Sequence, residues 1–161
     1  MNIQKVMVIG AGQMGSGIAQ VCAQAGYEVK LNDREEKFFE RGFQTISKNL
    51  SRNVEKGRMT EDDKQAVLNK ISKSLSINDA NDVDLVIEAA VENMEIKQSI
   101  FKQLDAIAPA HAILATNTSS LPITEIAAAT NRPEQVIGMH FMNPVPVMKL
   151  VEIIRGLATN D

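Results

Sequence analysis

The fold is decided at the amino terminus, where residues 3–15 read IQKVMVIGAGQMG. An apolar run is followed at once by three glycines, at a spacing that lets a strand turn tightly into a helix. The first amide groups of such a helix have no partner within it and attract an anion. The motif therefore predicts a dinucleotide site. The residues expected around its pyrophosphate are Gly10, Gly12, Gln13, Met14 and Gly15.

The rest of the chain alternates between strand and helix patterns. Strands are expected at 6–9, 27–31, 75–77, 83–89, 112–115, 136–140 and 147–154, and helices at 14–25, 35–56, 60–70, 94–107 and 123–129. The nearly continuous apolar run at 83–89 is typical of a strand buried on both faces. The alternation predicts one α/β domain over residues 1–161, a Rossmann-type doubly wound and mostly parallel sheet.

Composition narrows the class of protein. A chain of 161 residues with 44% hydrophobic residues suits one soluble domain with a real core. The net charge of -3 argues against a nucleic acid as partner. No apolar run approaches the roughly 18 residues of a membrane span, and no signal peptide is visible, so we expect a cytoplasmic protein without a membrane partner. Cys22 is the single cysteine, and no metal-binding pattern is visible.

Polar residues collect just after the predicted strands. Ligands of doubly wound sheets bind at the carboxyl ends of the strands, so these residues are expected to meet at one edge. The residues concerned are Asp33, Glu92, Lys97, Asn117, Ser119, His140 and Asn143. Their convergence is more specific than the glycine motif alone.

Asp33 indicates which dinucleotide is bound. It lies 18 residues after Gly15, near the offset of a carboxylate that accepts hydrogen bonds from a ribose diol. Such a carboxylate repels a 2′-phosphate, which favours NAD over NADP. Arg34 keeps NADP open, because a guanidinium can accommodate that phosphate. A solvated turn aspartate is the other interpretation of Asp33.

His140 and Glu152 suggest acid–base chemistry. Glu152 lies twelve residues after His140, within an apolar strand where a carboxylate should need a partner. If the two strands pair, Glu152 can orient the imidazole, as expected for a general base. The alternative for His140 is an ordinary core histidine. Ser119 is expected to point its hydroxyl into the cleft, and Ser120 to cap the helix that follows.

Four stretches together carry a family resemblance: the glycine motif at 10–15, EAAVEN at 88–93, NTSSL at 117–121 and HFMNPVPVMKLVE at 140–152. The chain resembles the short-chain 3-hydroxyacyl-CoA dehydrogenases over essentially its whole length, and most closely their bacterial 3-hydroxybutyryl-CoA branch. The resemblance implies reversible, NAD-dependent oxidation of a (3S)-3-hydroxyacyl-CoA to the 3-ketoacyl-CoA, in fatty-acid or butanoate metabolism.

The resemblance also implies roles for single residues. His140 and Glu152 resemble the catalytic dyad, and Ser119 the residue that touches both the substrate hydroxyl and the nicotinamide. Asn143 resembles a residue near the nicotinamide. Glu92 and Lys97 resemble further NAD contacts. Lys56 resembles a basic contact to the CoA moiety, although a solvated lysine is an equally good interpretation.

The resemblance has implications beyond this chain, and two alternatives to a complete dehydrogenase stand beside it. The resemblance implies a second, all-helical domain after residue 161, and a homo-oligomer, a dimer, when that domain is present. A chain without it could bind NAD and not turn over substrate. Another Rossmann β-hydroxyacid dehydrogenase, such as a 6-phosphogluconate or hydroxyisobutyrate dehydrogenase, is a third possibility, but those families lack the pair formed by His140 and Glu152.

Overall fold

The computed structural model describes residues 2–90, 92–118 and 120–161. Its strands are β1 (Lys5–Ile9), β2 (Glu28–Asn32), β3 (Ile71–Ser74), β4 (Leu85–Glu88), β5 (Ile113–Thr116), β6 (Val136–Phe141) and β7 (Val151–Arg155). Its α-helices are α1 (Gln13–Gln24), α2 (Glu36–Glu55), α3 (Glu61–Asn69), α4 (Met94–Ile107) and α5 (Ile123–Ala127). Two 3₁₀ helices, η1 (Ile77–Asp82) and η2 (Pro133–Gln135), complete the described elements.

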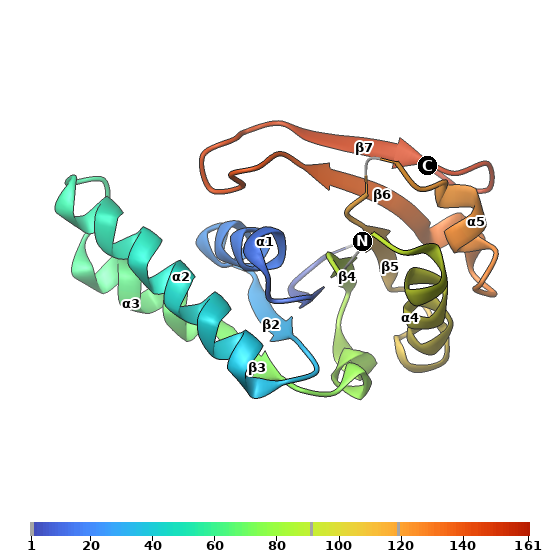
Figure 1. Cartoon of the computed structure of the whole chain (residues 1–161), viewed down its shortest axis with the longest axis horizontal. Coiled ribbons are helices and arrows are strands. Elements are labelled where there is room, and N and C mark those ends of the chain that lie inside the picture. Colours follow the sequence, from blue (N-terminus) through green and yellow to red (C-terminus); the bar gives the residue numbers. More distant parts are fainter. Residues whose placement is uncertain (1, 91, 119) are drawn as a thin grey trace.

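All seven strands join one sheet in the order β3-β2-β1-β4-β5-β6-β7 (Figure 1). The first six run parallel, and β7 alone is antiparallel, paired with β6. The strand order reverses between β1 and β4, which is the point where such sheets bind ligands. The Rossmann-type doubly wound sheet expected from the sequence is therefore confirmed.

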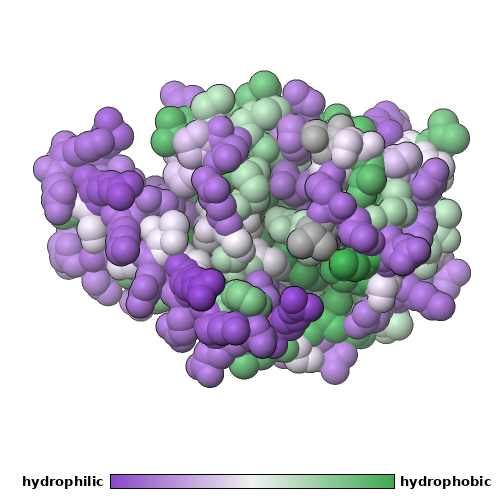
Figure 2. All heavy atoms as spheres, in the orientation of Figure 1, coloured by the Kyte–Doolittle hydropathy of each residue, from purple (hydrophilic) through white to green (hydrophobic). Residues whose placement is uncertain are grey.

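Two cores lie on opposite faces of the sheet. In β1, Val6 and Val8 belong to the core that α1, α2 and α3 cover, while Met7 and Ile9 belong to the core under α4 and α5. This alternation follows from the two-residue repeat of a strand. Beyond the first core, α2 and α3 form a long helical hairpin that extends away from the sheet (Figure 1). Figure 2 shows that this hairpin is mostly hydrophilic on the visible face.

The expected strand at 75–77 is wrong. The third strand is Ile71–Ser74, and Ile77 begins η1. Only Ile71 and Ser74 of this edge strand are buried, so its sequence carries no apolar alternation to predict it. Leu75 is 45% exposed, and the Ser76 hydroxyl accepts the amide of Asn78, which starts the 3₁₀ turn instead of a strand.

The last strand begins later than expected. Residues 147–150 do not belong to it, because a tight turn precedes it: the amides of Val147 and Met148 both donate to the Pro144 carbonyl. The strand is Val151–Arg155. The helix expected at 94–107 has the predicted bounds, and the ends of the other helices lie within two residues of those expected.

Candidate functional site

The glycine turn joins β1 to α1 with very little space. Gly10 has a φ of 100°, which favours glycine, and a Cβ on Gly15 would lie 1.6 Å from the Gly10 carbonyl oxygen. A Cβ on Gly12, in contrast, would meet nothing within 4 Å. Gly10 and Gly15 are therefore needed by the turn itself. Gly12 leaves open space where a ligand can approach the backbone.

Asp33 lies beside this turn, just after β2. Its Oδ2 accepts the amide of Ala11 at 2.9 Å, and its Oδ1 accepts the amide of Arg34 at 2.7 Å. The carboxylate is thus held against the glycine turn rather than being free in solvent. This is the position required of a group that receives the hydroxyls of a ribose.

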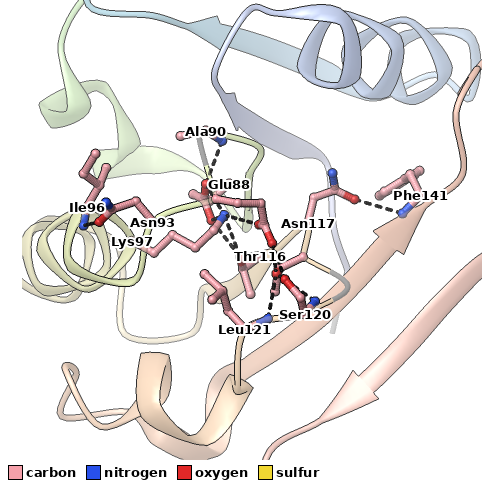
Figure 3. Close-up of polar contacts among 12 residues, drawn as sticks. Glu88, Ala90, Asn93, Ile96, Lys97, Thr116, Asn117, Ser120, Leu121 and Phe141 are labelled. Carbon is pink, nitrogen blue, oxygen red and sulfur yellow. Dashed lines mark hydrogen bonds and ion pairs between the residues drawn. The ribbon is translucent and has the colours of Figure 1, made fainter.

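A buried ion pair lies behind the ends of β4 and β5. The Lys97 ammonium, from α4, is 2.7 and 2.8 Å from the two carboxylate oxygens of Glu88, and neither side chain is exposed (Figure 3). Thr116 donates its hydroxyl to Glu88 Oε1, and the amide of Ala90 donates to Oε2. Sequence reasoning missed Glu88 and Thr116. The signal was a glutamate inside a buried strand, which requires a partner.

Glu92 connects this buried pair to the loop after β5. Its Oε2 accepts the hydroxyls of Thr118 and Ser120 at 2.7 and 2.9 Å, and its Oε1 is 3.4 Å from the Lys97 ammonium. Partial burial opposes ionisation, but the two hydroxyls and the positive charge of Lys97 outweigh it, so the pKa of Glu92 lies below its usual value. The carboxylate is therefore charged at neutral pH.

Ser120 does not cap the next helix, as the sequence suggested. Its hydroxyl is used by Glu92, and α5 has Pro122 at its N-cap position without a side-chain cap. The Thr118 hydroxyl oxygen accepts the amides of Ser120 and Leu121 instead. A threonine that serves both the loop amides and Glu92 could not be distinguished from its neighbours by sequence alone.

Two asparagines join the loops at the sheet edge. Asn117 accepts the amide of Phe141 on its Oδ1 at 2.9 Å, which ties the end of β5 to the end of β6 (Figure 3). Asn143 accepts the side-chain amide of Gln13 at 3.1 Å, which joins the following loop to the start of α1. Both halves of the sheet edge are thus connected by side chains.

His140 and Glu152 lie directly opposite each other in the antiparallel pair of β6 and β7. Both side chains lie on the face of the sheet that α4 and α5 cover. Residues an even number of positions apart in a strand share a face, and Val136 of β6 and Ile154 of β7 belong to the core under these helices. Glu152 is exposed rather than buried, because β7 is the edge strand. In the part of the chain that the structure describes, no hydrogen bond joins the two side chains.

A cleft of about 390 Å³ brings five of the expected residues together, namely Met14, Glu92, Asn117, His140 and Asn143. It is lined by Met14, Ala89, Ala90, Glu92, Asn117, Thr118, His140, Phe141, Met142 and Asn143. Lys97 lies in the buried layer next to Glu92, so its expected contact with a cofactor stays a prediction. Lys56 follows α2 at the tip of the helical hairpin, which extends away from the sheet (Figure 1), and it is not among the residues that line the cleft. Ser119 lies outside the described residues.

No group of three side chains suited to a metal ion occurs in residues 2–90, 92–118 and 120–161. In the same residues, no helix is both long and apolar enough to cross a membrane. The cytoplasmic location expected from the sequence stays a prediction.

A glycine turn, a carboxylate after the second strand and a polar cleft beyond the reversal point together define the cofactor domain of a dinucleotide-dependent dehydrogenase. Residues 5–161 match the family described as 3-hydroxyacyl-CoA dehydrogenase, NAD binding domain. The chain belongs to this family, and its cofactor is NAD. The family resemblance stated from the sequence is confirmed.

Relatives and solved structures agree with this assignment. The chain is 58% identical, over all 161 of its residues, to a probable 3-hydroxybutyryl-CoA dehydrogenase of Bacillus subtilis, and covers 56% of that protein. It is 54% identical to a 3-hydroxybutyryl-CoA dehydrogenase of Bradyrhizobium diazoefficiens over 99% of this chain and 54% of that one. The crystal structure of (S)-3-hydroxybutyryl-CoA dehydrogenase PaaH1 from Ralstonia eutropha superposes with a TM-score of 0.97, at 48% identity, covering 99% of this chain and 56% of that one. The chain thus spans about half the length of these relatives.

Proposed function

We propose that this chain is the cofactor-binding part of an enzyme that reversibly oxidises a (3S)-3-hydroxyacyl-CoA, such as 3-hydroxybutyryl-CoA, to the 3-ketoacyl-CoA. The observation that carries the proposal is the pairing of β6 with β7, which sets Glu152 directly opposite His140, a residue that lines the cleft. A histidine with a carboxylate neighbour is the arrangement expected of a general base. The names of the relatives support the substrate class.

In this mechanism His140 accepts the proton of the substrate hydroxyl. The bound NAD supplies the hydride acceptor. Glu152, one position across the strand pair, stabilises the imidazolium that His140 becomes. General-base catalysis of this kind contributes about 10²–10⁴-fold to a rate. Ser119, from the resemblance alone, would position the reacting oxygen.

The cofactor would lie across the reversal point of the sheet. The amides of Gln13 and Met14 at the start of α1 would face the pyrophosphate, and Asp33 would accept the adenosine ribose hydroxyls. The other half of NAD would occupy the cleft beside Asn117 and Asn143, within reach of His140. Lys56, on the hydrophilic hairpin, remains a candidate contact for the CoA moiety.

The dyad is tested in the intact protein that carries the full length of its relatives. His140→Ala and Glu152→Gln should each lower kcat far more than they weaken NAD binding, and by about 100-fold or more for His140. His111→Ala is the matched control: this second histidine binds Asp84 on the opposite edge of the sheet and should leave kcat unchanged. Equal losses in kcat and in NAD affinity would contradict the dyad.

A second candidate function is NAD binding without turnover by the chain as it stands. This second candidate is supported by an apolar surface that nothing in the described chain covers. The surface lies on and beside β7, and its side chains are between 56% and 92% exposed: Val147, Leu150, Ile153 and Leu157. Hydrophobic side chains are visible along this upper edge in Figure 2. We infer that the second, all-helical domain expected from the family covers this surface and completes the substrate pocket. The dimer expected with that domain stays a prediction.

The two candidates are separated by two measurements on this chain. NAD binding is followed by calorimetry, and turnover by the oxidation of NADH with acetoacetyl-CoA. Binding without turnover supports the second candidate, and turnover supports the first. A chain that neither binds nor reacts contradicts both. Turnover of a hydroxy acid that lacks CoA would favour another β-hydroxyacid dehydrogenase.

A further inference from the structure

The cleft holds one fixed negative charge. Two carboxylates, Glu88 and Glu92, share a single ammonium, that of Lys97. Lys97 and Glu88 are both fully buried and in close contact, so their charges cancel within the buried layer. Glu92, whose side chain is 45% exposed, is left with its charge at the cleft surface.

Glu92 is held in place from two sides. Thr118 and Ser120 donate their hydroxyls to one carboxylate oxygen, and the Lys97 ammonium approaches the other at 3.4 Å. All three are donors, so all three stabilise the ionised form. Among the described residues that line the cleft, His140 is the other titratable group. In the role of general base proposed above, His140 enters the reaction uncharged, so Glu92 carries the net charge of the cleft lining.

The nicotinamide half of the cofactor belongs in this cleft. A doubly wound sheet binds one mononucleotide on each of its halves. Asp33 marks the half formed by β1, β2 and β3 as the adenosine side, so the half formed by β4, β5 and β6 takes the nicotinamide. The nicotinamide ring carries a positive charge in NAD⁺. It becomes neutral in NADH, because the hydride brings both electrons of the new C–H bond.

We propose that Glu92 sets the preference of the site between the two redox states of its cofactor, by attracting the charged ring of NAD⁺ and not the neutral ring of NADH. This inference rests on the proposed function, since it requires NAD in the cleft. Two unit charges several ångströms apart near a protein surface change an affinity by roughly five- to ten-fold.

The test is the affinity of this chain for NAD⁺ and for NADH, each measured by calorimetry. Glu92→Gln removes the charge and keeps an oxygen that can accept from Thr118. The ratio Kd(NADH)/Kd(NAD⁺) should fall about five-fold, chiefly through weaker NAD⁺ binding. Glu95→Gln is the control, because it removes an equal charge from an exposed site in the first turn of α4. This variant should leave the ratio unchanged.

Wild-type protein gives a second readout that does not depend on a variant folding. Raising the salt from about 0.02 M to about 0.5 M should lower the same ratio, since salt screens the attraction. Equal weakening of NAD⁺ and NADH by Glu92→Gln, together with a ratio insensitive to salt, would overturn the inference while leaving the proposed function intact. Failure of the wild-type chain to bind either nucleotide would overturn both.

Discussion

At the scale of single residues, neighbouring glycines of one motif have different tasks. Gly15 is required by the fold, because a side chain there would collide with the backbone of Gly10. Gly12 has open space around its α-carbon, so its lack of a side chain serves the ligand and not the turn. A motif that is usually treated as one unit therefore divides into a structural part and a binding part.

This division can be tested with two substitutions. Gly12→Ala should lower the free energy of unfolding by less than about 1 kcal/mol, the scale of an N-cap change, yet weaken NAD binding at least about ten-fold. Gly15→Ala should weaken binding and also lower stability clearly, because the turn must open. Thermal unfolding and calorimetry measure the two effects. Equal stability of the two variants would contradict the assignment.

The buried ion pair is also a residue-scale feature with a measurable consequence. Lys97→Met leaves the buried Glu88 carboxyl group without its counter-charge, and should lower the free energy of unfolding by about 3–5 kcal/mol. Adding Glu88→Gln to Lys97→Met should recover part of this loss. Denaturant unfolding of both variants checks the expectation. A double variant no more stable than the single one would contradict it.

At the scale of elements, α3 shows how local chemistry defines a short helix. The Thr60 hydroxyl accepts the amide of Asp63, and the Asp63 carboxylate accepts the amide of Thr60, which forms a capping box. The hydrogen bond that the Thr60 amide donates, and then the Thr60 hydroxyl beside the carboxylate, hold the pKa of Asp63 below its usual value. The helix is only nine residues long, so the box is a large part of what fixes its start.

Thr60→Ala should therefore lower the free energy of unfolding by about 1 kcal/mol. Thr45→Ala is the matched control, because the Thr45 hydroxyl donates to the Arg41 carbonyl within α2 and caps nothing. Denaturant unfolding with both variants measures the difference. A loss at Thr45 as large as the loss at Thr60 would count against the cap.

At the scale of the whole molecule, Asp84 joins distant parts of the chain. It directly precedes β4, at the amino-terminal ends of the strands and so at the end of the sheet opposite the cleft. Its carboxylate accepts the amides of Gln4 and Lys5 and contacts His111 at 2.8 Å. These contacts lower the pKa of Asp84 to about 2. The largest effect comes from the amide of Gln4, followed by His111 and by the amide of Lys5. A pKa below that of the unfolded chain means that the carboxylate stabilises the fold above about pH 4 and loses this effect as the pH falls towards 2.

Asp84→Asn should lower the free energy of unfolding at pH 7 by about 2 kcal/mol and make stability less dependent on pH between about 5 and 2. Glu134→Gln is the control, since the Glu134 carboxylate makes no hydrogen bond or ion pair with the residues that the structure describes. Denaturant unfolding across this pH range measures both. An unchanged acid slope in Asp84→Asn would contradict the expectation.

The doubly wound fold, the dinucleotide site and the family can all be predicted from the amino-acid sequence. The fold and the site follow from local signals, because the glycine spacing and the apolar periods each act within a few residues. The sequence also predicts that Asp33, His140 and Asn143 lie at the same end of the sheet, because the carboxyl ends of parallel strands meet there. It did not predict β3, whose edge position requires little apolar surface.

The partners of the polar residues, in contrast, depend on the tertiary structure. Glu88, Lys97 and Thr116 come from three elements, and nothing local requires them to meet; burial makes their contact necessary once the strands and α4 are in place. The same holds for the exposure of Glu152, which depends on β7 being the last strand. Periodicity places a residue on a face, but its partner and its access to water depend on chain segments that pack from elsewhere.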